Sequence, residues 1–195
     1  MNHLAHFFLA ERAPGAVVGA FLGDFVKGKI AASDFPPPMR REIIVHRRID
    51  AFTDTDEILL GSKNRFVKTR RRFAGIVLDV AFDHFLAVNW TDYAAQNLDE
   101  FANFAYRALS ANADRFPADF QKILPQMIAD DFLAAYRDFA RVRFALQRLS
   151  ARVRGGENMR EAFGELAANY DYFQDVFREF FPRLQNFVAE TRKNL

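Results

Sequence analysis

The sequence predicts an all-α fold, and three observations support that prediction. Apolar residues recur every three or four positions over long stretches, most clearly from Leu166 through Tyr170, Phe173 and Phe177 to Phe187, which is the period of an amphipathic helix. Strand signals are nearly absent, because no turn dipeptide separates runs of alternating polar and apolar residues. The prolines and glycines that break the chain stand far apart. We expect seven to nine helices in one compact bundle.

The expected helices follow these breaks in order. Pro14-Gly15 interrupts the first apolar stretch, and the three prolines at 36–38 form the strongest stop in the chain. The helical period then runs through residues 76–85 and 132–146. Later boundaries are marked by Pro117, Pro125 and Gly155-Gly156. Pro182 falls inside the last helix, where we expect a kink because its ring removes a backbone donor and crowds the preceding turn.

Composition sets the broad class. With 195 residues, 50% hydrophobic and 27% charged, the chain suits a single domain spanning residues 1–195, and its 23 Phe offer a large apolar area for the core. The absence of Cys excludes a disulfide framework, a thiolate zinc site and a cysteine nucleophile. No apolar run approaches the ~20 residues of a membrane span. Glu11 and Arg12 interrupt the N-terminal apolar run, which is unlike a signal peptide, so we expect a cytoplasmic protein without a membrane partner.

Basic side chains are concentrated in one part of the sequence. Residues 40–72 hold 10 basic and 5 acidic side chains, a net of +5, whereas the whole chain has a net charge of +2. A local basic excess in a nearly neutral protein indicates an acidic partner or a phosphate rather than bulk nucleic acid.

All four His lie within the first 84 residues, and three of them stand near Asp in informative patterns. Asp79 and Asp83 are one helical turn apart and face the same way among large apolar residues, and His84 follows directly. His46 and Asp50 share a helix face in the same manner. A carboxylate on an apolar helix is costly to bury unless it is paired or bound to a metal.

Two further residues complete this set. Asp24 stands alone in an apolar stretch, and His6 lies among apolar residues of the first helix. Each residue alone is more simply interpreted as part of a surface or structural pair, but together they indicate a functional site. Imidazole and carboxylate ligands without sulfur suit Mn²⁺, Mg²⁺, Fe²⁺ or Zn²⁺, and such an ion can generate hydroxide and clamp phosphoryl oxygens. No phosphate loop, dinucleotide fingerprint, zincin motif or nucleophile elbow competes with this interpretation.

At these residues the chain resembles the bacterial acyl carrier protein phosphodiesterase family. The segments that carry the resemblance are Asn2-His3-Leu4-Ala5-His6, Gly19 through Gly28, His46 through Asp54, Arg71-Arg72, Gly75-Ile76, Leu78-Asp79, Asp83 through Ala87 and Trp90. Residues 170–182 also look similar, and residues 91–160 are the least distinctive. Each segment alone is a weak signal, whereas the ordered set is specific.

The resemblance implies a manganese-dependent enzyme with an HD-like helical fold, related to the HD-type metal phosphohydrolases. Its substrate is expected to be holo acyl carrier protein, and its products the apo protein and 4′-phosphopantetheine. Mn²⁺ is the expected cofactor, with Mg²⁺ or Fe²⁺ as alternatives. The implied metal ligands are Asp24, His46, Asp79, Asp83 and His84. The implied catalytic residues are His6 as a general acid, Asp24 as a possible base instead of a ligand, and Asp50.

The resemblance also gives the basic residues an expected role, because acyl carrier proteins are acidic and complementary charge speeds encounter. The expected partner-binding residues are Arg47, Arg48, Arg70, Arg71 and Arg72. A second set at helical spacing, which we interpret as solvated surface, consists of Arg137, Arg141, Arg148 and Arg152.

Two departures from the family pattern stand out. Position 3 is His where Phe is usual, which we interpret as incidental, and Asp83-His84 runs in the reverse order of the usual HD signature. Two other functions stay open: an HD-like phosphohydrolase acting on a nucleotide or small phosphodiester, and a non-catalytic helical protein that binds carrier protein through its basic face.

Overall fold

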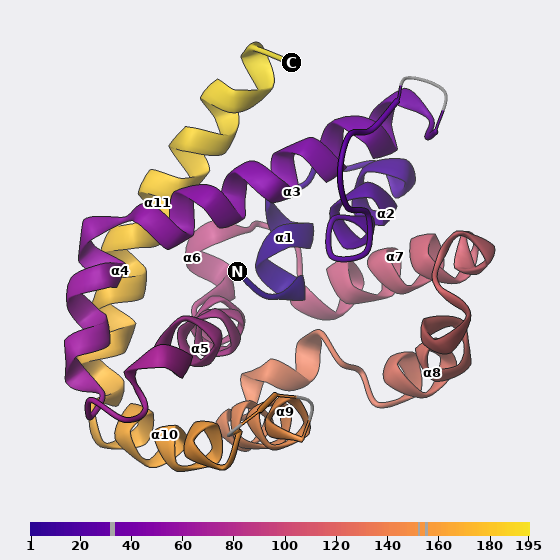
Figure 1. Ribbon diagram of the computed structural model, residues 1–195. Helices are drawn as coiled ribbons and strands as arrows, with labels where there is room; N and C mark the ends of the chain where they lie inside the picture. Colours follow the sequence, from indigo (N-terminus) through magenta and orange to yellow (C-terminus); the bar gives the residue numbers. More distant parts are fainter. Residues whose placement is uncertain (32–33, 152, 155) are drawn as a thin grey trace.

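The computed structural model describes residues 1–31, 34–151, 153–154 and 156–195, and within them it contains α-helices and short 3-10 turns but no β-strand (Figure 1). The α-helices are α1 (His3–Leu9), α2 (Pro14–Leu22), α3 (Pro37–Thr55), α4 (Glu57–Ser62), α5 (Ala74–Val88), α6 (Trp90–Tyr93), α7 (Leu98–Ser110), α8 (Ala118–Ala129), α9 (Phe139–Ser150), α10 (Glu157–Ala168) and α11 (Tyr170–Lys193). Four 3-10 turns join them: η1 (Lys63–Arg65), η2 (Arg71–Phe73), η3 (Ala113–Arg115) and η4 (Ala134–Arg137).

The all-α prediction is confirmed, but the expected number of helices was too low. The described residues form eleven α-helices instead of seven to nine. Two of them, α4 and α6, have only six and four residues, too few to show a helical period in the sequence. Among the described residues, none of the helices combines the length and apolarity that crossing a membrane requires.

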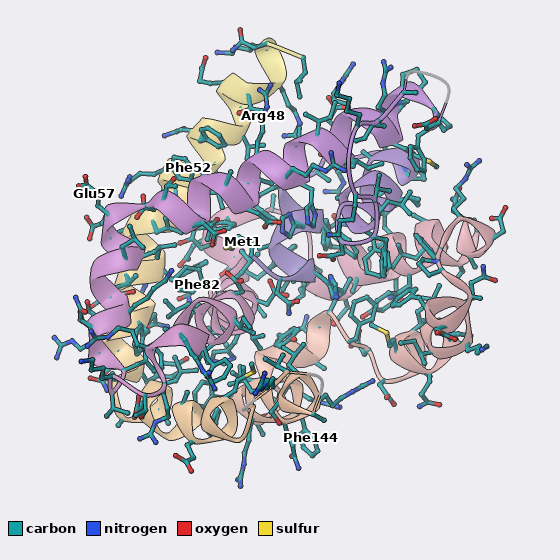
Figure 2. The ribbon with its side chains drawn as sticks, viewed as in Figure 1. Met1, Arg48, Phe52, Glu57, Phe82 and Phe144 are labelled. Atoms are coloured by element: carbon teal, nitrogen blue, oxygen red, sulfur yellow. The ribbon has the colours of Figure 1, made fainter. Side chains whose placement is uncertain are left out.

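Helix α5 is the centre of the bundle. It is apolar almost all round, and α1, α9, α10, α11 and η4 pack against it, as expected of a helix that is buried on every side. Phe82 is fully buried and contacts the rings of Phe177 and Phe180 on α11. Figure 2 shows Phe82 in the interior of the molecule. Asp83 and His84 therefore lie in the most buried element of the fold.

Helix α11 carries the apolar stripe that the sequence predicts. Its buried residues include Phe173, Phe177, Phe180 and Leu184. The helix begins at Tyr170, so Leu166 belongs to α10, and it runs on through Pro182 to Lys193.

Helices α2 and α3 pack closely, and glycine makes this approach possible. A Cβ added at Gly19 would lie 2.4 Å from the carbonyl oxygen of Met39, and one at Gly23 would lie 2.2 Å from the ring of His46. Both glycines are on α2 or at its end, one turn apart. Their bare backbones thus bring α3, with His46 and Asp50, against the helix that leads to Asp24. In Figure 1 the N-terminus lies in the middle of the molecule, near α1, α3 and α5.

Candidate metal centre

Three side chains from α1 and α3 converge on one point. His6 Nε2 lies 3.1 Å from Asp50 Oδ1, and His46 Nε2 lies 3.2 Å from Asp50 Oδ2. The two imidazole rings are stacked, with centroids 3.7 Å apart and planes 11° from parallel. One ligand atom from each residue can be chosen so that all three lie within 4.8 Å of one another. We call His6, His46 and Asp50 the metal cluster.

The backbone of α2 fixes the orientation of His46. Its Nδ1 lies 2.7 Å from the carbonyl oxygen of Ala20, and because a carbonyl oxygen only accepts, Nδ1 is the donor. In the neutral ring Nε2 then carries the lone pair, and it faces Asp50 and also Asp24, whose Oδ1 is 3.6 Å away. A lone pair and two carboxylates repel one another unless a proton or a metal cation lies between them.

His6 is held less tightly by hydrogen bonds. It is 2% exposed, and its Nδ1 has no hydrogen-bond partner among the described residues. Burial lowers the pKa of His6 to about 3, although the hydrogen bond to Asp50 acts in the opposite direction. His6 is therefore neutral at pH 7, the state in which imidazole binds a metal.

Asp50 is the carboxylate that both rings share. Burial raises its pKa, but the pairing with the imidazoles of His46 and His6 and the charge of the Met1 amino group outweigh burial and hold the pKa well below its usual range. Its side chain is 43% exposed. The cluster thus presents a charged carboxylate on its open side at neutral pH.

Further charged groups border the cluster. The Met1 amino group lies 3.4 Å from Asp50 Oδ1 and 3.1 Å from Asp79 Oδ1, so a positive charge already sits between these two carboxylates. Asp24 lies between His46 and His3, whose Nδ1 is 3.5 Å from Asp24 Oδ2. The sequence analysis interpreted His3 as incidental. The signal that could have placed His3 beside Asp24 was the family pattern, in which position 3 is usually Phe.

Asp83 lies outside the cluster. It is fully buried, and its two oxygens accept the backbone N–H groups of Leu4 and Ala5 at 2.8 and 2.9 Å. These are orphan donors in the first turn of α1, so Asp83 caps that helix from α5. Burial raises the pKa of Asp83 to about 7, although the two N–H groups favour its charged form. Asp83 thus holds α1, and with it His6, against α5.

His84 is also separate from the cluster. Its Nδ1 lies 2.7 Å from the Tyr136 carbonyl oxygen and its Nε2 lies 2.8 Å from the Tyr170 hydroxyl. The ring is 2% exposed, and burial lowers its pKa. Both nitrogens are used to join α5 to η4 and α11. The structure therefore brings His6, Asp24, His46, Asp50 and Asp79 together but gives Asp83 and His84 structural partners instead.

The basic residues divide into two kinds. Arg47 donates to the carbonyl oxygens of Val26 and Gly28, and Arg70 forms ion pairs with Glu161 and Glu165. These two cations support the fold. By contrast, the side chains of Arg48, Arg71 and Arg72 are exposed and form no ion pair with the described residues. Arg48 lies on the outer surface of α3 (Figure 2).

The second basic set is divided as well. Arg137 pairs with Asp99 at 2.5 Å, and Arg152 lies outside the described residues. Arg141 and Arg148 are exposed on α9, but they also line a groove next to Asp24.

The donor chemistry of the metal cluster fits a divalent cation. Two imidazole nitrogens and a carboxylate, with further carboxylates beside them and no sulfur, suit Mn²⁺, Fe²⁺ or Zn²⁺. His46 has the tautomer that a ligand needs, fixed by a backbone carbonyl in the way typical of metal-binding imidazoles. The neutral state of the His6 ring agrees with the same role. Its Nδ1 lacks the hydrogen-bond partner among the described residues that orients His46.

Comparison with known proteins supports one family. The family model described as acyl carrier protein phosphodiesterase matches residues 1–184. Proteins named acyl carrier protein phosphodiesterase from Salmonella paratyphi A, Salmonella agona and Salmonella newport are each 32% identical over 185 residues, which cover 94% of this chain and 95% of theirs. No solved structure matches, so the expected likeness to HD-type folds stays a prediction. The chain belongs to the acyl carrier protein phosphodiesterase family.

Proposed function

We propose that the protein hydrolyses the phosphodiester that joins 4′-phosphopantetheine to the serine of holo acyl carrier protein, giving the apo protein and 4′-phosphopantetheine. The observation that carries the proposal is the metal cluster, in which two oriented imidazoles share one carboxylate. Family membership supplies the substrate class.

We propose that His6, His46 and Asp50 hold a divalent cation, Mn²⁺ in the first place and Mg²⁺ or Fe²⁺ as alternatives. Asp24 lies beside His46, and Asp79 is linked to Asp50 through the Met1 amino group, so both border the proposed ion site. Such an ion would activate water and neutralise charge on the phosphoryl oxygens. The Ala20 carbonyl and the bare backbone of Gly23 keep His46 in place for this role.

Asp24 is the residue best placed to accept a proton from the attacking water. Its side chain is 43% exposed, it touches the cluster through His46, and it also lines the groove beside α2. His6 is a poorer proton donor than the sequence analysis expected. A ring with a pKa of about 3 carries no spare proton at pH 7, and so we propose His6 as a ligand.

The carrier protein would meet the enzyme through the unpaired cations. We propose Arg48, Arg71 and Arg72 for this contact, because exposed cations that form no ion pair with the described residues can steer an acidic protein. Arg47 and Arg70 would contribute indirectly, since each holds a neighbouring segment in place.

The test is mass spectrometry of holo acyl carrier protein after incubation with the protein and Mn²⁺, with a chelator control. We expect a loss of about 340 Da, the phosphopantetheine arm, only when metal is present. Cleavage of a small chromogenic diester without any change in the carrier protein would favour a small-phosphodiester hydrolase. Metal-independent binding of carrier protein without cleavage of either substrate would favour a non-catalytic binder.

A further inference from the structure

A groove of about 450 Å³ runs between α2, α8 and α9, and Asp24 is among the residues that line it. Asp24 Oδ1 lies 3.6 Å from His46 Nε2 of the cluster, and His3, which also lines the groove, lies 3.5 Å from the other Asp24 oxygen. The rest of the lining is mainly apolar, with Arg141 and Arg148 of α9 among it. Asp24 therefore joins the groove to the cluster.

Aromatic rings form a continuous floor that starts at His3. The ring of His3 lies 5.1 Å from that of Phe21, and Phe21 lies 4.7 Å from Phe120 and 5.4 Å from Phe25. Phe120 belongs to α8, so this floor joins α2 to α8. A ligand whose polar end lies beside Asp24 would meet apolar surface along the rest of its length.

Two large apolar side chains stand exposed at the rim. Ile123 of α8 is 36% exposed and Phe144 of α9 is 61% exposed, and both line the groove. Figure 2 shows Phe144 projecting from α9. Neighbouring exposed apolar groups around a depression are typical of ligand-binding surfaces.

We propose that this groove binds the pantetheine arm of the substrate, an inference that rests on the proposed function. The arm is a slender chain that begins at the phosphate and carries a geminal dimethyl group, two amides and a thiol. Its phosphate would lie at the cluster and its apolar parts on the aromatic floor, while Arg141 and Arg148 offer donors to the amide carbonyls.

The size of the groove favours the arm over a protein segment. Its volume falls within the roughly 300–1,000 Å³ of small-molecule sites. An α-helix of the carrier protein, about 10–12 Å wide with its side chains, would need a wider trough. The carrier protein itself would therefore stay outside and deliver only its arm.

The first test is calorimetric titration of free 4′-phosphopantetheine, with inorganic phosphate as a probe that lacks the arm. Phe144→Ala and Ile123→Ala should each weaken binding of 4′-phosphopantetheine about fivefold to tenfold, because each removes apolar contact area. Leu60→Ala is the matched control, since Leu60 is 46% exposed on α4 and does not line the groove. The affinity of Leu60→Ala for 4′-phosphopantetheine should stay within twofold of wild type. The affinity for inorganic phosphate should not change in any of the three variants.

Equal affinity of wild type and both groove variants for 4′-phosphopantetheine would overturn the proposal. So would a parallel loss of phosphate affinity, because the variants would then act on the cluster instead of the arm.

A second test closes the groove with Ala145→Trp. Cleavage of holo carrier protein should fall more than about a hundredfold, whereas cleavage of a small chromogenic diester should stay within threefold. Equal effects on both substrates in a variant with unchanged melting temperature would contradict the proposal, and if this variant does not fold, the titrations decide. If the wild type does not cleave holo carrier protein, the proposed function fails, and selective loss of 4′-phosphopantetheine binding still decides whether the groove is the arm site.

Discussion

The metal cluster and the Asp83-His84 pair look alike in the sequence and differ in what surrounds them. In both, an imidazole donates its Nδ1–H to a backbone carbonyl: His46 to Ala20 and His84 to Tyr136. The Nε2 of His84 then meets a hydroxyl, which can donate to it. The Nε2 of His46 meets two carboxylates, which cannot. The hydrogen bonds of the His84 ring are satisfied within the protein, whereas Nε2 of His46 needs a proton or a metal cation.

The carboxylates differ in the same way. Asp83 is fully buried and accepts two backbone N–H groups, whereas Asp50 is 43% exposed and is bordered by imidazoles and an amino group. An Asp or His on an apolar helix therefore indicates a functional site only when some of its hydrogen-bonding atoms have no partner within the fold. Four predictions test this difference.

The largest effect should come from Asp50→Asn. The variant removes the charge of the carboxylate that both imidazoles share, so turnover of holo carrier protein should fall more than about a hundredfold. This loss is larger than the roughly 10–100-fold loss typical of removing a residue that only supports a metal ligand. Because the partners of Asp50 hold its pKa below the usual range, the free energy of unfolding should also fall, by an amount limited by the 43% exposure of the side chain. Steady-state kinetics and urea denaturation measure the two quantities. Wild-type turnover in this variant would remove Asp50 from the site.

Asp83→Ala should show the opposite pattern. It leaves the N–H groups of Leu4 and Ala5 buried without acceptors, and we expect a loss of about 3 kcal/mol in the free energy of unfolding. Asp83→Asn is the matched control and should lose about half as much, because one acceptor oxygen remains. Urea denaturation of metal-free protein measures both. A stability equal to wild type in Asp83→Ala would show that the cap contributes nothing.

Gly23→Ala tests whether the position of His46 matters. The added Cβ would lie 2.2 Å from the His46 ring, so the ring must move, and turnover should fall about tenfold as it does when a ligand loses its orientation. Gly61→Ala is the control, because its Cβ would meet nothing within 4 Å. That helical position should gain roughly 0.5–1 kcal/mol of stability with unchanged turnover. Equal turnover in the two variants would contradict this role of Gly23.

The smallest effect concerns pH. Because burial lowers the pKa of His6 from 6.5 to about 3, its contribution to stability is complete above pH 6.5 and is lost as the pH falls, since only the unfolded chain takes up the proton. His6→Gln should make the pH dependence between about 6.5 and 4 shallower by one proton, about 1.4 kcal/mol per pH unit. Denaturation of metal-free protein across this range measures the slope. Identical slopes would show that His6 is charged in the folded state.

Local reasoning from the sequence predicted those features that depend on neighbours along the chain. The apolar stripe of α11 and the shared face of His46 and Asp50 were both read from helical period and are present. The partners of Asp83 were not predictable in this way, because Leu4 and Ala5 lie 79 and 78 residues away in the sequence. The same holds for Arg70, whose partner Glu165 is 95 residues away. Long-range packing decides which polar atoms the fold consumes.

The most direct test of the account is a Mn²⁺ titration of metal-free protein, followed by electron paramagnetic resonance, in which His46→Gln is paired with His84→Gln. We expect His46→Gln to lose tight Mn²⁺ binding because it removes a proposed ligand. His84→Gln should bind as wild type does, even if it is less stable. Tight binding in His46→Gln together with its loss in a folded His84→Gln would contradict the account and place the ion at the Asp83-His84 pair.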